Sequence, residues 1–311
     1  MIKWFAKEDI DKPQLQTPTA NVYNGIYIPQ EYKYNVLKHL ILNYCGNING
    51  LKPALFLAIQ GFRGEGKTFM LQALCDFYNI EAEFLSGSDL CGPNEGDSKN
   101  IIKQRYETAC VRASQSQRLS VIIIDDFHLS IAADYGESVS KTTNSQVLVS
   151  YLMNLADYPY KFNIRIPIIL IGNNFKNIYP ALIRNGRIDF FSWRPTIDDK
   201  EQIVYYMFKK FYPGIAFDDV KLLVASYPQK YIAFFSNVIQ DIFFTNFQSV
   251  VNEFERMNGC ISLANINQVV RSSIRIDTSI SSRVLLDYAA KRAIKKEENF
   301  ENDLKKGGVI E

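Results

Sequence analysis

Residues 61–68 read GFRGEGKT, which fits the spacing of a phosphate-binding loop, G-x-x-x-x-G-K-S/T. An apolar run of strand length, residues 54–59, precedes this octapeptide, and residues 69–74 have the apolar spacing of a helix. The motif carries meaning only in such a strand–loop–helix context. The sequence therefore predicts a nucleoside triphosphate site in an α/β domain.

Each residue type in the loop has a physical role. We expect Gly61, Gly64 and Gly66 to adopt positive φ and bring backbone N–H groups close to phosphate oxygens. Lys67 is expected to reach the β- and γ-phosphates, and the Thr68 hydroxyl to bind Mg²⁺. The residues assigned to ATP binding are Gly61, Gly64, Glu65, Gly66, Lys67, Thr68 and Phe69.

Composition excludes several other classes of protein. With 47% hydrophobic and 22% charged residues, the 311-residue chain can bury an ordinary core. A net charge of +2 argues against a nucleic-acid partner, and no apolar run approaches the length of a membrane span. Five scattered cysteines without a C-x-x-C pair, and only two histidines, favour a reducing compartment and argue against a zinc site.

Buried strands alternate with helices as far as about residue 195, which predicts a mostly parallel, doubly wound sheet followed by a small α-helical domain. Strands are expected at residues 54–59, 83–86, 121–124 and 166–171, and helices at 27–44, 100–112 and 146–157. The predicted domains are a flexible N-terminal arm (1–24), the nucleotide-binding α/β part (25–195), the helical part (196–290) and a charged C-terminal tail (291–311).

Polar residues follow two of the predicted strands. Asp125 and Asp126 end the run at residues 121–124, which we expect to lie beside the phosphate-loop strand. Asp125 is assigned to Mg²⁺ and Asp126 to polarising the attacking water, although two solvated loop aspartates would look the same. Asn173 follows the next strand and could bind the γ-phosphate or the water, whereas Gly-Asn-Asn is also ordinary turn chemistry.

Arg184 and Arg187 are three residues apart and could lie on one helical face. A guanidinium pairs with phosphate oxygens in two places, so these arginines could complete a site in a neighbouring subunit. The simpler alternative is ion pairing at the surface.

Together these motifs resemble the AAA+ ATPases, and more narrowly rubisco activase of the cyanobacterial and green-plant type. The resemblance runs from about residue 25 to residue 248, and the segment IPIILIGNNFKNIYPALIRNGRIDFFSWRP is its most specific part. It implies a ring, expected to be a hexamer, that uses ATP and Mg²⁺ to act on the rubisco large subunit and release inhibitory sugar phosphates. It also implies that Asn173 is the sensor-1 residue and that Arg184 and Arg187 bridge subunits. Segments 86–91 and 130–143 would face the central pore.

The chain departs from the family pattern in places. No arginine follows Phe234-Phe235, where the family carries its sensor-2 residue, and His128 replaces a second acid. We also expect no rubisco-contacting N-terminal domain and no C-terminal domain resembling the rubisco small subunit. Three alternatives therefore stay open: an ATPase that remodels another client, a regulatory ATP-binding ring with weak hydrolysis, and a DNA-loading AAA+ protein. The expected compartment is the bacterial cytosol or the plastid stroma.

Overall fold

A computed structural model describes residues 21–46, 52–90, 96–127, 143–158, 164–175, 182–184, 186–245, 247–256 and 280–306. Several sequence predictions lie outside these residues: most of the N-terminal arm, Cys91, His128 and the loop at 130–142. No helix in the described part of the chain is both long and apolar enough to cross a membrane.

A five-stranded sheet forms the centre of the α/β part, and every neighbouring pair of its strands is parallel. The strand order is β4-β5-β6-β3-β7. The strands are β3 (Phe56–Gln60), β4 (Glu81–Ser86), β5 (Ser120–Asp125), β6 (Ile168–Gly172) and β7 (Ile188–Ser192). The expectation that the Asp125 strand lies beside the phosphate-loop strand is therefore wrong, because β6 lies between β5 and β3.

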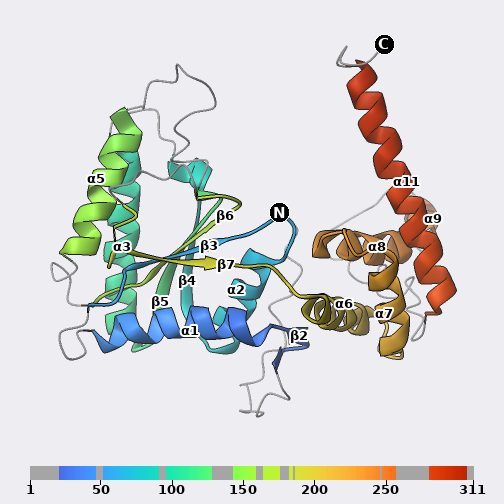
Figure 1. Cartoon of the computed structure of the whole chain (residues 1–311), viewed down its shortest axis with the longest axis horizontal. Helices are drawn as coiled ribbons and strands as arrows, with labels where there is room; N and C mark the ends of the chain where they lie inside the picture. The colour runs from blue at the N-terminus through green and yellow to red at the C-terminus, as the bar shows by residue number, and fades with distance from the viewer. Residues whose placement is uncertain are drawn as a thin grey trace.

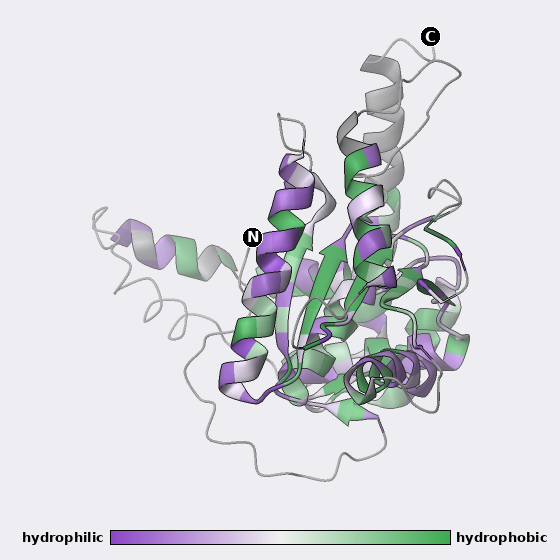
Figure 2. Cartoon of the chain, turned by 90° about the vertical axis from the view of Figure 1, so that its left-hand side faces the viewer, coloured by the Kyte–Doolittle hydropathy of each residue, from purple (hydrophilic) through white to green (hydrophobic). Residues whose placement is uncertain are grey.

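Helices cover both faces of this sheet, which explains why its central strands are apolar without alternation. In β5, Ile122 and Ile124 pack with α3 (Asp97–Ser116) and α5 (Thr143–Asp157). The alternate side chains, including Ile123, pack on the other face with α1 (Gln30–Cys45) and α2 (Lys67–Phe77). Figure 1 shows α3 and α5 together on one side of the sheet, and Figure 2 shows the strands as hydrophobic.

Two short strands lie at the end of the predicted N-terminal arm and just after it. β1 (Val22–Tyr23) pairs antiparallel with β2 (Ile26–Tyr27), and Tyr23 is buried. Residues 21–24 therefore belong to the folded part of the chain, and the predicted boundary at residue 24 is too late. The hairpin turn uses Asn24 and Gly25, both at positive φ, a conformation that these two residue types tolerate.

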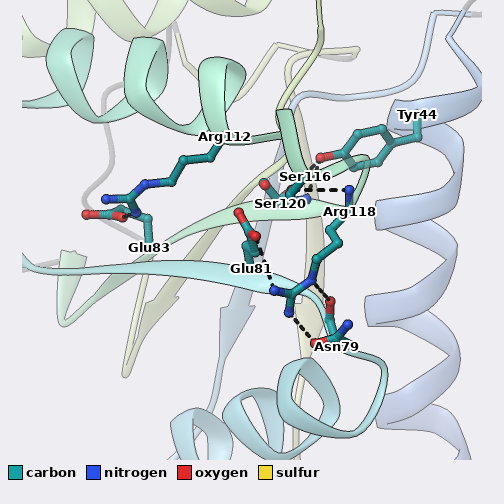
Figure 3. A network of polar contacts seen from close by, with 8 residues as sticks. All are labelled: Tyr44, Asn79, Glu81, Glu83, Arg112, Ser116, Arg118 and Ser120. Atoms are coloured by element: carbon teal, nitrogen blue, oxygen red, sulfur yellow. Dashed lines mark hydrogen bonds and ion pairs between the residues drawn. The ribbon is translucent and has the colours of Figure 1, made fainter. Parts of the chain in front are cut away.

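A polar network lies along β4, which is an edge strand of the sheet (Figure 3). The Arg118 guanidinium pairs with Glu81 at 3.2 Å and donates to the main-chain oxygen of Asn79 at 3.0 Å. Arg112, on α3, pairs with Glu83 at 2.8 Å. Charged side chains along an edge strand oppose its pairing with another chain.

The remaining described helices gather beyond the end of β7 (Figure 1). They are α6 (Ile197–Phe211), α7 (Phe217–Ser226), α8 (Ile232–Thr245), α9 (Phe247–Arg256) and α11 (Ser282–Lys306). A capping box between Thr196 and Asp199 starts α6. These helices bury their own core, with Phe208, Phe235 and Leu285 among its members. The predicted tail boundary at residue 291 falls inside α11, so this helix continues through the start of the assigned tail.

Candidate nucleotide-binding site

The phosphate loop joins the end of β3 to the start of α2, as the sequence predicts. Gly64 (φ 83°) and Gly66 (φ 74°) adopt the left-handed conformation that favours glycine. Gly61 does not, so its expected positive φ is wrong. It is needed for space instead, because a Cβ there would lie 2.4 Å from the main-chain oxygen of Trp193.

Lys67 is buried, and its ammonium group bonds to the loop itself. Its Nζ donates to the main-chain oxygens of Gly61 and Phe62 at 2.8 and 2.9 Å. Burial lowers the pKa of Lys67, while Asp125 and Asp126 oppose that shift. The Tyr32 hydroxyl donates to the Lys67 main-chain oxygen at 2.5 Å and so fixes the start of α2. The lysine therefore lies within its loop, close to the two acids.

Thr68, at the start of α2, contacts Asp125, at the end of β5, although β6 lies between β5 and β3. The Thr68 hydroxyl donates to Asp125 Oδ2 at 2.8 Å. The carboxyl ends of parallel strands share one edge of a sheet, so this contact bridges the sheet across the intervening strand. A hydroxyl and a carboxylate oxygen are hard ligands of the kind Mg²⁺ prefers, and the pair fits the predicted magnesium site. Among the described residues, no cluster of three or more His, Cys, Asp or Glu side chains could hold a metal.

Asp126 lies next to this pair in a constrained position. Its φ is 50°, and its N–H donates to Asp125 Oδ1 at 2.9 Å. A Cβ on Gly87, just past the end of β4, would lie 2.3 Å from the Asp126 main-chain oxygen. Gly87 thus permits the position of Asp126, a role that sequence reasoning missed. The only signal was a glycine directly after a predicted strand.

Two other predicted residues lie at the same edge of the sheet. Asn173 follows the last residue of β6 and is exposed, which places it between the ends of β5 and β3. Phe69 lies in the first turn of α2 with its side chain 46% exposed. Their functional roles stay predictions.

The two arginines lie elsewhere. Arg187 directly precedes β7, and its N–H donates to the Arg184 main-chain oxygen at 3.1 Å, with Gly186 at positive φ between them. The expected helical face is therefore wrong: the segment is a turn. Because β7 runs parallel to β3, this turn lies at the opposite edge of the sheet from the phosphate loop.

Asp157, at the end of α5, binds Arg187 in two places. The Arg187 Nε and Nη2 atoms donate to the two carboxylate oxygens at 2.8 and 2.6 Å. This pairing lowers the pKa of Asp157 and raises that of Arg187. Arg184 is exposed, and no ion pair joins it to any described carboxylate.

The sequence is similar to those of known ATPases. Residues 57–196 match the family "ATPase family associated with various cellular activities (AAA)". Ribulose bisphosphate carboxylase/oxygenase (rubisco) activase from Nostoc sp. is 31% identical over 255 residues, covering 78% of this chain and 60% of that protein. The activase from Anabaena sp. is 30% identical over 249 residues, covering 77% and 59%.

A chloroplastic rubisco activase from Cucumis sativus is also 30% identical, over 225 residues that cover 69% of this chain and 53% of that protein. The chain thus spans between about half and three fifths of the length of these relatives. The AAA match begins at the second residue of β3, includes β4 to β7 and ends at the residue before α6. The chain is therefore a divergent, rubisco activase-like member of the AAA+ ATPases.

Proposed function

We propose that this chain hydrolyses ATP in a homo-oligomeric ring and uses the energy to remodel rubisco, releasing inhibitory sugar phosphates. The observation that carries the hydrolytic part is the Thr68–Asp125 contact at 2.8 Å beside the buried Lys67. It brings the loop lysine, a hydroxyl and a carboxylate together at one edge of a parallel sheet. The similarity to proteins named rubisco activase supports the client.

We assign each residue of the site a separate role in ATP binding or hydrolysis. The loop N–H groups and Lys67 bind the phosphates, and Thr68 with Asp125 holds Mg²⁺, which neutralises charge on the phosphate oxygens. Asp126 accepts a hydrogen bond from the attacking water and polarises it, and Asn173 orients the water or the γ-phosphate. In this assignment Asp125, Asp126 and Asn173 act on the same bound nucleotide.

Arg184 and Arg187 supply the positive charge from a neighbouring subunit. They lie one strand length, about 16 Å, from their own phosphate loop, too far to serve it. Arg184 is exposed and makes no ion pair with a described carboxylate, although its charge helps to lower the pKa of Asp157, and we assign the direct contact with the neighbour's phosphate to it. Arg187 is anchored by Asp157 and sets the position of the turn. The ring, which we propose to be a hexamer, follows from this shared site.

The test is reactivation of rubisco that carries a tight-binding sugar phosphate, with ATP and the purified chain. We expect carboxylation to recover with the wild-type chain and not with Lys67→Ala. If the wild-type chain consumes ATP while carboxylation stays low, the rubisco assignment is wrong. An Asp126→Asn variant, which binds ATP without turnover, would then be used to capture the actual client.

A second candidate is a regulatory ATP-binding ring with weak hydrolysis. One observation favours it: α8 contains no arginine or lysine, so the helix offers no cation to the nucleotide. Turnover well above background that Arg184→Ala abolishes would exclude this candidate. The proposed compartment, cytosol or plastid stroma, is supported by the cyanobacterial and chloroplastic relatives.

A further inference from the structure

Glu65 places a buried carboxylate inside the phosphate loop, at a position where the motif accepts any residue. The residue is 4% exposed, and its Oε2 accepts a hydrogen bond at 3.3 Å from the N–H of Ile232, the first residue of α8. The main-chain oxygen of Glu65 accepts a second bond, at 2.9 Å, from the Trp193 indole. The loop is thus bonded both to the segment after β7 and to the small helical part.

Gly64, the residue before Glu65, makes a similar contact with α8. The Gly64 main-chain oxygen accepts a hydrogen bond at 2.9 Å from the N–H of Ala233. A Cβ on Gly64 would lie 3.0 Å from the Ala233 Cβ, so the two backbones approach closely. Two consecutive loop residues therefore bind the first two residues of α8.

Several positive or partly positive groups surround the buried Glu65 carboxyl group. The first N–H groups of a helix have no partner within the helix and carry partial positive charge. Burial raises the pKa of Glu65, and the Ile232 N–H, Lys200 and Lys67 offset only part of that shift. Lys200 also donates to the main-chain oxygens of Pro228 and Lys230, and so orders the turn before α8.

The Ile232 side chain also joins α8 to the α/β part through packing. It is 5% exposed and packs in the core that includes α1, α2 and one face of the sheet, whereas the rest of the α8 core residues pack with α6, α7 and α11. The first residue of α8 therefore packs with the α/β part, whereas Phe234 and Phe235 in the same turn pack in the core of the helical part.

We propose that Glu65 is a positioning residue that couples nucleotide binding in the loop to the orientation of α8. The inference rests on the proposed ATP-driven function. The Lys67 ammonium donates to the Gly61 and Phe62 oxygens, and a triphosphate competes with these oxygens for it, so nucleotide binding affects the loop backbone. Glu65 and Gly64 transmit that change to α8, which contains no arginine to sense the nucleotide itself.

The experiment compares the full-length chain with Glu65→Ala, Glu65→Asp and Glu65→Gln. Aspartate keeps the charge but is one methylene too short to reach Ile232, and glutamine keeps an acceptor oxygen without the charge. Thr196→Ala is the matched control, because it removes a helix cap from α6 without a contact to the loop. Hydrogen exchange of residues 232–236 is measured without nucleotide, with ADP and with a hydrolysis-resistant ATP analogue, beside nucleotide affinity.

In the wild-type chain and in Thr196→Ala, we expect nucleotide to change exchange in this segment. Glu65→Ala and Glu65→Asp should abolish that change and weaken affinity for the ATP analogue by about tenfold, the loss of one charge-assisted hydrogen bond. Glu65→Gln should keep the change. If Glu65→Ala does not fold, the exchange response of Glu65→Asp to nucleotide tests the proposal.

Two results would count against the proposal, and they differ in what they overturn. If the wild-type chain binds nucleotide and Glu65→Asp shows the same exchange response, or if α8 does not respond at all, the coupling role is wrong and the ATPase proposal stands. If the wild-type chain binds no nucleotide, the proposed function fails as well.

Discussion

His39 shows how one side chain can make the stability of this protein depend on pH. It lies buried on α1, where its Nδ1 is 3.5 Å from the Asn43 amide nitrogen. Burial lowers the pKa of His39 from 6.5 to about 3; hydrogen bonding to the Ile168 and Leu55 main chain opposes this shift, and the charge of Arg165 adds to it. The imidazole is therefore neutral in the folded chain at every pH above about 3.

We expect the free energy of unfolding to fall as the pH drops below 6.5. Between the two pKa values the unfolded chain binds a proton at His39 and the folded chain does not, so acid favours unfolding. At about pH 5 the loss attributable to His39 should be about 2 kcal/mol relative to neutral pH. Urea unfolding of the wild-type chain and His39→Leu, at both pH values, measures it. Equal losses in the two proteins would show that other groups cause the acid sensitivity.

At the same scale, the loop residues show what sequence can and cannot predict. The roles of Lys67 and Thr68 follow from the motif, because its spacing fixes the backbone around a phosphate. The buried position of Glu65 does not, since its partner Ile232 is 167 residues away in sequence. A local pattern carries no information about a contact that only the tertiary fold creates.

Among the elements, the buried strands were the most predictable. The apolar runs of β3, β5 and β6 are distinct because helices cover both faces of the sheet. β7 was missed because it is an edge strand whose Asp189 and Phe190 are exposed, which leaves an irregular pattern. The order of the strands was not predictable either, since nothing in a sequence marks that β6 inserts between β3 and β5.

The contact between the ends of β4 and β5 gives a prediction at the level of elements. A methyl group on Gly87 would lie 2.3 Å from the Asp126 main-chain oxygen. Moving this backbone atom costs more free energy than moving the end of a flexible side chain would. Gly87→Ala should therefore displace Asp126 and lower kcat by about a hundredfold, as small misplacements of catalytic groups do. ATP affinity should change by less than about twofold, because Lys67 and Thr68 lie on other elements.

Steady-state turnover and binding of a fluorescent ATP analogue separate these two effects. Gly96→Ala is the control, since it adds a methyl group where no atom of the described residues lies within 4 Å and adds backbone strain at φ 86°. Undiminished turnover in Gly87→Ala would show that the position of Asp126 does not limit hydrolysis.

For the whole molecule, the two edges of the sheet hold two halves of one proposed site. The phosphate loop, Asp125 and Asn173 lie at the carboxyl edge, and the Arg184–Arg187 turn lies at the amino edge. A head-to-tail ring brings these unlike edges of neighbouring subunits together. The sequence predicted this arrangement only through resemblance, because the separation of the edges depends on the parallel direction of β7 and β3.

We propose that each nucleotide site is shared between two subunits, and an experiment that mixes two inactive variants examines this sharing. Lys67→Ala lacks the loop lysine and keeps the arginines, while Arg184→Ala has the opposite defect. We expect each to lose ATP turnover by about a hundredfold or more when alone. After mixing in equal amounts, roughly a quarter of the interfaces should hold a complete site, and turnover should recover in that proportion. Full turnover by Arg184→Ala alone, or no recovery on mixing variants shown to co-assemble, would contradict a shared site.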